Sequence, residues 1–417
     1  MLKLKTLKDA SLKGKRVIFR VAYDVPLLEE QGGWKVADDT RIRSSIPTLK
    51  LLLKNKCKII IITWLGRPGG KHSEKLKLNP VAKRLEELIK KPVRKLDNCK
   101  GPGVETIIKG MKEGEIVMLE NVRFNPEEEG KRASFADTLA RYGELVVFEA
   151  FAQSHRDYPS TTGLLERLPS VCGLDMEKEM MILSNLLQAP KHPFIVILGG
   201  AKISDKIETL KHLLPLADIV LIGGAMAHNF LKAQGIKIAA SFVEDAYSKK
   251  EKKYVFQIAE EILNQAKGTF VNLGPGLNIP KLVLPLDLIA APKIGQSVET
   301  KIIEITEDGN LPWNWMYLDI GPKTLELYSR IIAKGNTIFW NGPMGYFELD
   351  AFGEGTKGVA KAIAKSKAIS VIGGGDTESI VKKYALKNAF DHVSTGGGAL
   401  LEFLSGKELP VMQYLKH

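Results

Sequence analysis

The sequence predicts an α/β fold with doubly wound parallel sheets, and two observations support this prediction. Short runs that are apolar and rich in β-branched residues recur at 58–63, 194–198, 218–222, 336–340 and 369–372. Strands that are apolar on both faces are typical of parallel sheets covered by helices on each side. Between the runs, apolar residues recur at helical spacing, for example at Ile203, Ile207, Leu210 and Leu214. Alternating strands and helices define the α/β class.

The chain divides into two halves near residues 188–193, where two prolines follow a helical stretch and precede the strand at 194–198. The two halves differ in the residues that their loops carry. Loops of the first half carry Arg41, Arg67, Arg123 and Arg156, whereas loops of the second carry glycines at 199–200, 223–224, 373–375 and 396–398. We therefore expect an anion site in the first half and a nucleotide site in the second.

Composition narrows the class of protein. A chain of 417 residues, 44% hydrophobic and 26% charged, is long enough for two or three globular domains. Its longest apolar runs fall far short of the roughly 20 residues that cross a bilayer, and its first residues do not resemble a secretory signal. Cys57, Cys99 and Cys172 have neither disulfide nor zinc spacing. We expect a cytoplasmic protein that does not bind membranes.

The net charge of +12 indicates attraction to anions without saying which anion. Phosphates on a metabolite, a nucleotide or a nucleic acid are all compatible with this charge. The sequence contains no zinc-finger or RNP motif and only 7% aromatic residues, so we do not expect a nucleic-acid partner.

The glycine loops are candidate phosphate sites. A strand, a glycine pair and a helix in succession can present backbone N–H groups and the positive end of a helix dipole to a phosphate. None of the four loops matches a Walker A sequence or G-x-G-x-x-G. In any one loop, glycine can simply permit a tight turn. Four loops after successive strands, at the edge where such sheets bind ligands, favour a nucleotide crevice.

Charged residues accompany two of these loops. Lys202 and Lys206 follow the loop at 199–200 and, if helical, lie on one side of the first helical turns beside the expected phosphate. Asp376 follows the loop at 373–375. It can be the N-cap of the next helix, a ligand of the Mg²⁺ that accompanies a polyphosphate, or both.

Six collinear motifs resemble phosphoglycerate kinase. They are Leu65-Gly-Arg-Pro, Leu119-Glu-Asn-Val-Arg-Phe, Gly199-Gly-Ala-Lys-Ile-Ser-Asp-Lys, Trp340-Asn-Gly-Pro-Met-Gly, Gly373-Gly-Gly-Asp-Thr and Ser394-Thr-Gly-Gly-Gly-Ala. The resemblance extends from Gly14-Lys-Arg-Val to Gly406-Lys-Glu-Leu-Pro, which is nearly the whole chain.

This resemblance implies two doubly wound α/β domains joined by a hinge in a monomer. We expect an acid-substrate domain at 1–175, completed by a tail at 404–417, a linker at 176–192 and a Mg-nucleotide domain at 193–403. Members of the family transfer the γ-phosphoryl of ATP reversibly to the carboxylate of 3-phosphoglycerate. Phosphoryl transfer depends on positioning and fixed positive charge, and a carboxylate acceptor needs no general base.

The resemblance also assigns roles to residues. Arg41, Arg67, Arg123 and Arg156 are expected to hold the phosphorylated acid, with Arg41 and Lys202 as the catalytic pair. Asp376 is expected to bind Mg²⁺. The residues expected to contact ATP or ADP are Gly200, Lys202, Lys206, Gly223, Gly224, Asn341, Glu348, Gly373, Gly374, Gly375, Asp376 and Thr377.

The chain departs from the family in the acid pocket. Ala22 and Asp24 replace the Asp and Asn of the family's Arg-Val-Asp-Phe-Asn-Val-Pro signature, Trp64 replaces a histidine, and Tyr158 replaces a second histidine. Asp24 can take over from the missing acid, and Trp64 is expected to line the pocket. Alanine cannot bond a substrate hydroxyl, and Trp offers a single donor on a larger body.

Three hypotheses follow from these departures. The chain is a phosphoglycerate kinase with a differently built acid pocket, or it forms an acyl phosphate from a related phosphorylated carboxylic acid, or it is a catalytically weakened nucleotide-binding relative. The presence of Arg41, Lys202 and Asp376 argues against the third hypothesis.

Overall fold

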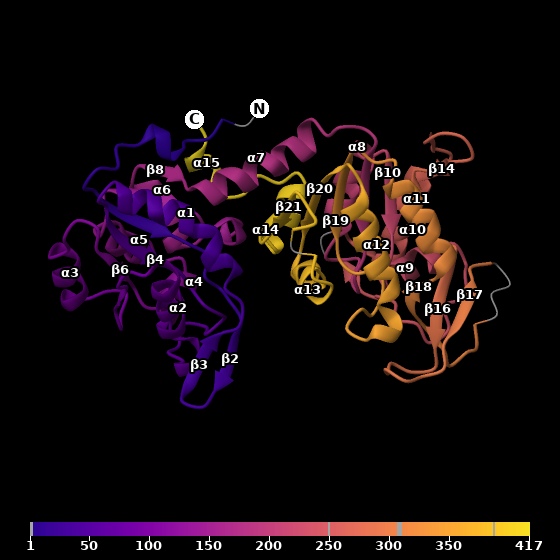
Figure 1. Cartoon of the computed structure of the whole chain (residues 1–417), viewed down its shortest axis with the longest axis horizontal. Coiled ribbons are helices and arrows are strands. Elements are labelled where there is room, and N and C mark those ends of the chain that lie inside the picture. Colours follow the sequence, from indigo (N-terminus) through magenta and orange to yellow (C-terminus); the bar gives the residue numbers. More distant parts are fainter. Residues whose placement is uncertain (1–2, 249–250, 307–310, 387) are drawn as a thin grey trace. The chain divides into compact units, whose positions relative to one another are not determined.

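The structure, a computed structural model, describes residues 3–248, 251–306, 311–386 and 388–417. The chain divides into two compact units (Figure 1). Unit 1 comprises Met1–Ser184 and Glu408–His417, and unit 2 comprises Asn185–Lys407. The long helix α7 (Leu174–Gln188) runs from the first unit into the second. Among the described residues, no helix is long and apolar enough to cross a membrane.

Unit 1 is built on a six-stranded sheet in the order β5-β6-β4-β1-β7-β8, and every neighbouring pair is parallel. The strands are β1 (Arg16–Arg20), β4 (Lys58–Ile62), β5 (Arg94–Lys95), β6 (Ile116–Met118), β7 (Leu145–Phe148) and β8 (Ser170–Cys172). A separate antiparallel hairpin joins β2 (Leu27–Glu30) to β3 (Gly33–Val36). The helices are α1 (Thr40–Lys54), α2 (Asn79–Ile89), α3 (Pro102–Lys109), α4 (Pro126–Glu129), α5 (Ala133–Ala140), α6 (Leu164–Arg167) and α15 (Met412–Leu415).

Both faces of this sheet are buried, as expected for strands that are apolar throughout. Val17 and Phe19 of β1 and Ile59 and Ile61 of β4 form one cluster with apolar residues of α1 and α2. The alternate position Ile18 points to the other face and is equally buried. The prediction of parallel sheets covered on both sides is confirmed for this unit.

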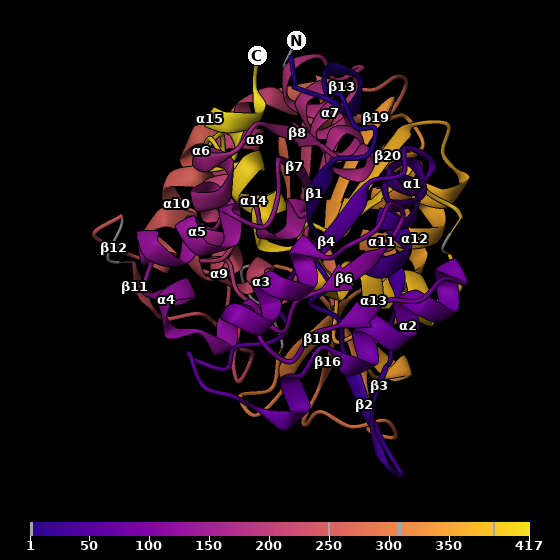
Figure 2. The same cartoon turned by 90° about the vertical axis from the view of Figure 1, so that its left-hand side faces the viewer.

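The two ends of the described chain lie side by side in unit 1 (Figures 1 and 2). Leu4 forms an antiparallel bridge with Lys416, and the Lys5 N–H donates to the Leu415 carbonyl at 2.8 Å. On its other side, the N-terminal segment bridges to Cys172 of β8. The tail that follows unit 2 therefore packs onto the edge of unit 1.

Unit 2 has a second parallel six-stranded sheet, in the order β15-β10-β9-β19-β20-β21. Its strands are β9 (Phe194–Leu198), β10 (Ile219–Ile222), β15 (Leu282–Val283), β19 (Thr337–Asn341), β20 (Ile369–Gly373) and β21 (His392–Ser394). The helices are α8 (Ile207–Leu216), α9 (Met226–Ala233), α10 (Val255–Ala266), α11 (Pro322–Ile332), α12 (Glu354–Lys365), α13 (Gly375–Lys383) and α14 (Gly398–Leu404).

Three smaller antiparallel groups complete unit 2. An additional sheet has the order β17-β16-β18, and two hairpins pair β11 with β12 and β13 with β14. The strands are β11 (Tyr247–Ser248), β12 (Lys253–Tyr254), β13 (Phe270–Asn272), β14 (Asn278–Pro280), β16 (Asp287–Ala291), β17 (Lys301–Glu304) and β18 (Met316–Ile320).

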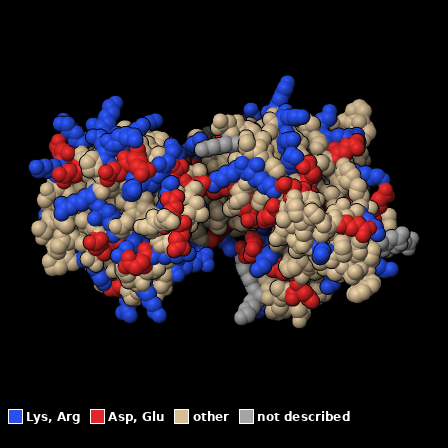
Figure 3. Space-filling model, turned by 60° about the horizontal axis from the view of Figure 1, so that its bottom comes forward, with Lys and Arg blue, Asp and Glu red and all other residues tan. Residues whose placement is uncertain are grey.

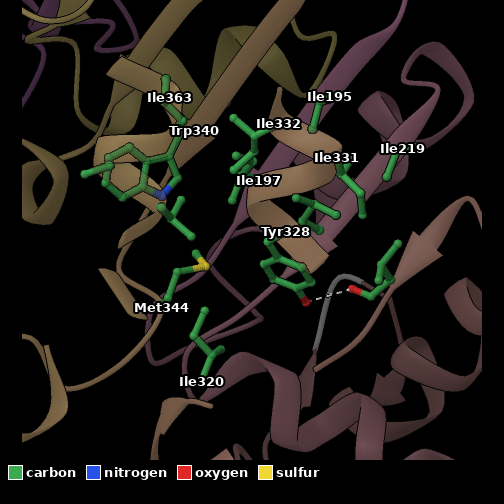
Figure 4. Close-up of a cluster of buried hydrophobic side chains, with 14 of the residues drawn as sticks. Ile195, Ile197, Ile219, Ile320, Tyr328, Ile331, Ile332, Trp340, Met344 and Ile363 are labelled. Carbon is green, nitrogen blue, oxygen red and sulfur yellow. Dashed lines mark hydrogen bonds between the residues drawn. The ribbon is translucent and has the colours of Figure 1, made fainter. Parts of the chain in front are cut away.

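The core of unit 2 supports the loops at the end of its parallel sheet. Figure 4 shows Tyr328, Trp340 and Met344 in this core. The Tyr328 hydroxyl donates to the Ile222 carbonyl at 2.6 Å. A methyl group added to Gly223 would lie 2.4 Å from the Met344 sulfur. The glycine loop after β10 is therefore packed directly onto a core side chain, which fixes its path.

Candidate active site

Positive charge is spread over the surfaces of both units. On the face drawn in Figure 3, Lys and Arg side chains are interspersed with Asp and Glu. A mixed surface of this kind does not mark an anion site by itself. The candidate site residues at the ends of the strands therefore have to be considered one by one.

In unit 1, the expected acid-binding residues gather at one edge of the sheet. Asp24 follows β1, Trp64 and Arg67 follow β4, Arg123 follows β6, and Arg156 follows β7. Because these strands are parallel, their carboxyl ends meet at the same edge, where open α/β sheets bind ligands.

Asp24 and Arg41 are bonded to each other and to the neighbouring loop. The Arg41 Nη1 donates to the Asp24 carbonyl at 2.7 Å, and the Asp24 Oδ1 accepts from the Gly66 N–H at 2.9 Å. The Asp24 side chain thus joins the loop after β1 to the loop after β4. One oxygen of the Asp24 carboxylate already accepts a hydrogen bond from the Gly66 N–H. Asp24 therefore has a structural function, in addition to any contact that it makes with the phosphorylated acid substrate.

Trp64 is at the centre of a cluster of cations. The guanidinium carbons of Arg20 and Arg123 lie 4.5 and 4.3 Å from the Trp64 ring centroid. Tyr158 meets the indole edge to face, with a centroid distance of 5.9 Å. The Trp64 side chain is 2% exposed, so nearly all its surface is in contact with protein. Arg67 is exposed and Arg156 is half-buried, so both present their charge outside this cluster.

The unpartnered buried polar atoms of the described residues concentrate at this same edge. They are Arg20 Nη2, Arg123 Nε, His155 Nδ1 and both amide atoms of Gln153. Buried polar groups are usually hydrogen-bonded, and each one that is not calls for an explanation such as a ligand or an ordered water. Arg20 closes β1, Arg123 follows β6, and the other two follow β7, so one local site accounts for all of them.

Burial shifts the protonation of several groups here. It lowers the pKa of Arg20 to about 9, with Glu128 opposing the shift and Arg123 adding to it. Burial also lowers the pKa of His155 to about 4, and the charges of Arg156 and Arg123 lower it further. His155 is therefore neutral at pH 7, and its buried Nδ1 can either accept or donate a hydrogen bond, depending on the tautomer.

Sequence reasoning had not placed Arg20 or Gln153 in the site, although an arginine ending an apolar strand is a recognisable signal.

In unit 2, the glycines after β9 and β10 pack against the loop after β19. The N–H groups of Gly200 and Gly224 donate to the carbonyls of Pro343 and Met344, at 2.8 and 2.9 Å. The Gly223 N–H donates to the Leu198 carbonyl at 2.9 Å. A methyl group added to Gly224 would lie 2.6 Å from the Gly200 nitrogen. Glycine is required here for close approach of three loops, and these amides are engaged with the protein backbone.

The expected helical placement of Lys202 and Lys206 is wrong. Helix α8 begins at Ile207, and residues 201–206 form a turn closed by the bond from the Lys206 N–H to the Ile203 carbonyl. The Ser204 N–H donates to Glu244 at 2.9 Å, which holds the turn away from helical geometry. Ile203 belongs to this turn, and its side chain is buried without being part of a helix. Its helical spacing with Ile207 in the sequence was therefore coincidental.

The two lysines consequently differ in environment. Lys202 is exposed, whereas Lys206 is 8% exposed and its ammonium lies against Gly200. Burial lowers the pKa of Lys206, while the nearby carboxylates of Asp205, Asp376 and Glu244 oppose that shift. Lys206 and Asp376 are thus close enough to interact, which brings the loops after β9 and β20 together.

The loop after β20 is organised by side-chain bonds. The Asn341 Nδ2 donates to the Gly373 carbonyl at 2.6 Å. The Thr377 hydroxyl donates to the same carbonyl at 2.9 Å and accepts from the Gly342 N–H at 3.1 Å. Gly374 has a φ of 111°, a conformation that side chains disfavour. These contacts fix the path of the chain from β20 into α13.

The suggestion that Asp376 caps this helix is also wrong. The N-cap of α13 is Gly374, and the exposed residues Gly375 and Asp376 belong to the first turn. A carboxylate at this position still complements the positive end of the helix dipole. Asp376 is exposed, so it remains accessible to a cation.

Glu348 lies at the other end of α13. It is exposed, and its carbonyl accepts from the Lys383 ammonium at 3.2 Å. Lys383 is the last residue of α13, whose first turn contains Asp376. At about 1.5 Å per residue, the two ends are roughly 10 Å apart along the helix axis. Glu348 is therefore separate from the cluster around Lys206.

These features define a class of protein: two α/β units, each with charged or glycine-rich loops at the carboxyl edge of a parallel sheet. Comparison with known proteins gives the family. The family model for phosphoglycerate kinase matches residues 7–407, so the chain belongs to the phosphoglycerate kinase family. The resemblance inferred from the motifs is confirmed.

Individual relatives agree over their full lengths. The chain is 43% identical over 406 residues to the phosphoglycerate kinase of Rubrobacter xylanophilus, covering 97% of this chain and 96% of the relative. It is 44% identical over 413 residues to that of Aquifex aeolicus, covering 99% and 98%. Solved structures from Coxiella burnetii and Pyrococcus horikoshii superpose with TM-scores of 0.83 and 0.82, at 32% and 33% identity, each covering 99% of this chain and 98% of the other.

Proposed function

We propose that the chain transfers the γ-phosphoryl of Mg-ATP reversibly to the carboxylate of 3-phosphoglycerate, giving 1,3-bisphosphoglycerate and ADP. Membership of the family supports this reaction. The observation that carries it is the concentration of unpartnered buried polar atoms at the arginine-rich edge of the unit 1 sheet. A small anion with several oxygens can accept hydrogen bonds from the donors in this set, which are the arginine nitrogens and the Gln153 Nε2.

The two units divide the substrates in this proposal. The region 1–175, with the tail 404–417, takes the phosphorylated acid, and the region 193–403 takes the nucleotide. Arg41, Arg67, Arg123 and Arg156 hold the acid, because the planar guanidinium meets carboxylate and phosphate oxygens two at a time. The linker 176–192 acts as a hinge that brings the two bound substrates together.

The nucleotide side uses loops whose geometry is already fixed. Lys202 and Lys206 contact the phosphates, and Thr377, Asn341 and the backbone of residues 373–375 complete the phosphate side. Glu348 binds the ribose, in keeping with its distance from the cluster around Lys206. Gly200, Gly223 and Gly224 border the base and phosphates. Their N–H groups are already bonded within the protein, so these residues make room for the nucleotide by having no side chain and do not donate hydrogen bonds to it.

Asp376 is the residue proposed to hold Mg²⁺. Its carboxylate is exposed, and the described residues contain no group of three His, Cys, Asp or Glu side chains suited to a metal. One carboxylate fits Mg²⁺ in this setting, because the ion is usually bound by one or two carboxylates together with substrate phosphates and water. When bound, the ion would neutralise charge on the nucleotide phosphates.

The residues of the chain supply charge and position. A carboxylate oxygen of the acid attacks the γ-phosphorus while the bond to the ADP oxygen breaks, and ADP departs with that electron pair. No proton moves, so the neutral state of His155 is no obstacle. Arg41 and Lys202 stabilise the charge that spreads over the transferring oxygens. Closure of the hinge would exclude water that otherwise hydrolyses ATP.

We also infer that the protein is a monomer and is located in the cytoplasm.

A related phosphorylated acid is the alternative substrate. The observation in its favour is that Ala22 and Trp64 stand at positions where the family has hydrogen-bonding residues. Loss of a hydrogen bond costs about 0.5 to 1.5 kcal/mol, or up to about 3 kcal/mol with a charged partner, which changes the preference among acids.

The test incubates the purified protein with Mg-ATP and 3-phosphoglycerate and traps the acyl phosphate with hydroxylamine. Lys202→Ala is the control for contaminating activity. We expect turnover in the natural protein and its loss in the control. Absence of turnover in the natural protein, with recovery in an Ala22→Asp/Trp64→His double variant, would instead assign the chain to another phosphorylated acid.

A further inference from the structure

The indole of Trp64 is buried and lies against an arginine. Its side chain is 2% exposed, and the Arg123 guanidinium carbon lies 4.3 Å from its ring centroid. The sequence suggests that the residue lines the acid pocket, yet an indole this deeply buried has almost no free surface to offer.

The contacts of Arg123 leave part of its hydrogen-bonding edge unused. Its Nη1 donates to the Gly66 carbonyl at 2.7 Å, and the Tyr158 ring centroid lies 5.9 Å from its guanidinium carbon. Its Nε lies 3.3 Å from the Glu129 carboxylate but makes no hydrogen bond. An aromatic ring over a guanidinium occupies the face of the cation and leaves its plane free. With Nη1 bonded to Gly66 and Nε beside Glu129, Nη2 is the nitrogen of Arg123 that is left for an anion.

Four contacts therefore act on the Arg123 guanidinium: the Trp64 ring, the Gly66 carbonyl, the Tyr158 ring and the Glu129 carboxylate. Gly66 has a φ of 65° and its loop is tied to Asp24, so the carbonyl is itself held in place. Arg20 stacks on the same indole at 4.5 Å, and its own Nε donates to the Ser160 carbonyl at 2.8 Å. The neighbours of Trp64 are thus held by their own bonds, so they cannot move in to replace its ring over Arg123 if it is removed.

We propose that Trp64 is a positioning residue that holds the Arg123 guanidinium in the orientation that binds the phosphorylated acid, without contacting that acid. The inference rests on the proposed function for the identity of the acid. It predicts that the π face of the side chain, and not its bulk alone, controls the affinity for the acid.

A matched pair of variants separates these two properties. Trp64→Phe keeps an aromatic face, whereas Trp64→Met is a similarly sized apolar side chain without one. Trp34→Leu is the control, because Trp34 also stacks with a cation, the Lys75 ammonium at 4.6 Å, but lies on the β2–β3 hairpin of the same unit. Circular dichroism checks that each variant folds.

We expect Trp64→Met to raise the KM for 3-phosphoglycerate about tenfold to thirtyfold, in line with a desolvated cation–π contact. The turnover number should change less than about threefold, because Arg123 binds the acid equally in the ground and transition states. Trp64→Phe should raise this KM less than about fivefold. The KM for ATP should be unchanged in all three variants.

A second measurement does not depend on activity. Binding of an anion to Arg123 changes the electric field at the stacked indole, so 3-phosphoglycerate should alter the tryptophan fluorescence of the natural protein and of Trp34→Leu. The change should be lost in Trp64→Phe. This measurement also decides the matter if Trp64→Met does not fold.

Equal KM values in Trp64→Met and Trp64→Phe, or a fluorescence change that survives in Trp64→Phe, would overturn the inference. Failure of the proposed function has a different signature, which is absence of turnover in the natural protein. In that case inorganic phosphate serves as the probe, and weaker phosphate binding by Trp64→Met than by Trp64→Phe still supports the positioning role, whereas equal binding refutes it.

Discussion

Glu149 provides a test of how burial and pH control the stability of unit 1. It follows β7, is 4% exposed, and accepts bonds from the N–H groups of Asp175 and Met176 at 3.2 and 3.1 Å as well as from the Thr48 hydroxyl. Burial raises the pKa of Glu149 from 4.5 to about 8, with the bond to Thr48 opposing this shift. At pH 7 the folded protein therefore holds a neutral carboxyl at the first turn of α7.

The sign of the effect follows from proton binding. Between pH 4.5 and about 8, the folded state binds a proton at Glu149 that the unfolded state has released, so the free energy of unfolding falls as pH rises. The slope reaches at most about 1.4 kcal/mol per pH unit. Over the whole interval the loss is at most about 5 kcal/mol.

Glu149→Gln removes this titration while keeping a neutral side chain of the same shape. Its amide can accept the two backbone bonds through oxygen and donate to Thr48 through nitrogen. We expect the variant to match the natural protein within about 1 kcal/mol at pH 5 and to be more stable at pH 9 by about 2 to 5 kcal/mol.

The three cysteines provide the assay. Cys57, Cys99 and Cys172 are free, buried and confined to unit 1, so labelling of thiols in increasing urea follows unfolding of that unit by itself. Two equally steep stability curves, with a constant difference between variant and natural protein from pH 5 to 9, would refute the reasoning. Asp319→Asn, in unit 2, is the matched control and should leave the thiol transition unchanged.

The remaining predictions concern unit 2 and the acid site. Burial raises the pKa of Asp319 to about 8, so Asp319→Asn should reduce the loss of unit 2 stability between pH 5 and 9, measured by urea unfolding followed at a dye placed in that unit. Gly224→Ala, at a φ of 64° and facing the Gly200 nitrogen at 2.6 Å, should cost more than about 1 kcal/mol and raise the KM for ATP, with the KM for 3-phosphoglycerate as the internal comparison. The pKa of His155, held at about 4 by burial and two arginine charges, should rise when a phosphorylated acid neutralises those charges. An NMR titration with and without 3-phosphoglycerate measures this, and an unchanged midpoint would place the acid elsewhere.

The strands of the two parallel sheets could be predicted from sequence because burial on both faces leaves a continuous apolar run. The five predicted runs correspond to β4, β9, β10, β19 and β20. Strand β17 of the β17-β16-β18 sheet left no such run, since Lys301, Ile302 and Glu304 are exposed and only Ile303 is partly buried. The start of α8 was also misjudged, because a buried residue in a turn can imitate helical spacing.

The candidate site was predictable as a set of residues but not as an arrangement. The motifs named Arg123 and Trp64, yet the stack that joins them to Arg20 depends on three segments that meet only in the folded sheet. Likewise, the buried and exposed environments of Lys206 and Lys202 follow from the turn at residues 201–206. Local sequence contains no record of such contacts between distant segments.

The return of the C-terminal tail to unit 1 affects the order in which the chain can fold during synthesis. Residues 408–417 pair with the segment around Leu4 and Lys5, but they are synthesised only after the whole of unit 2. Unit 2, by contrast, is continuous in sequence and can complete its contacts earlier. Closing a flexible loop as long as unit 2 would carry a large entropic cost, whereas an already folded unit 2 shortens the chain that has to be closed. The side of the N-terminal segment that faces away from β8 therefore stays unpaired until residues 408–417 have been synthesised, and a nascent chain paused before residue 408 exposes the backbone groups of that segment to chaperones and to other chains.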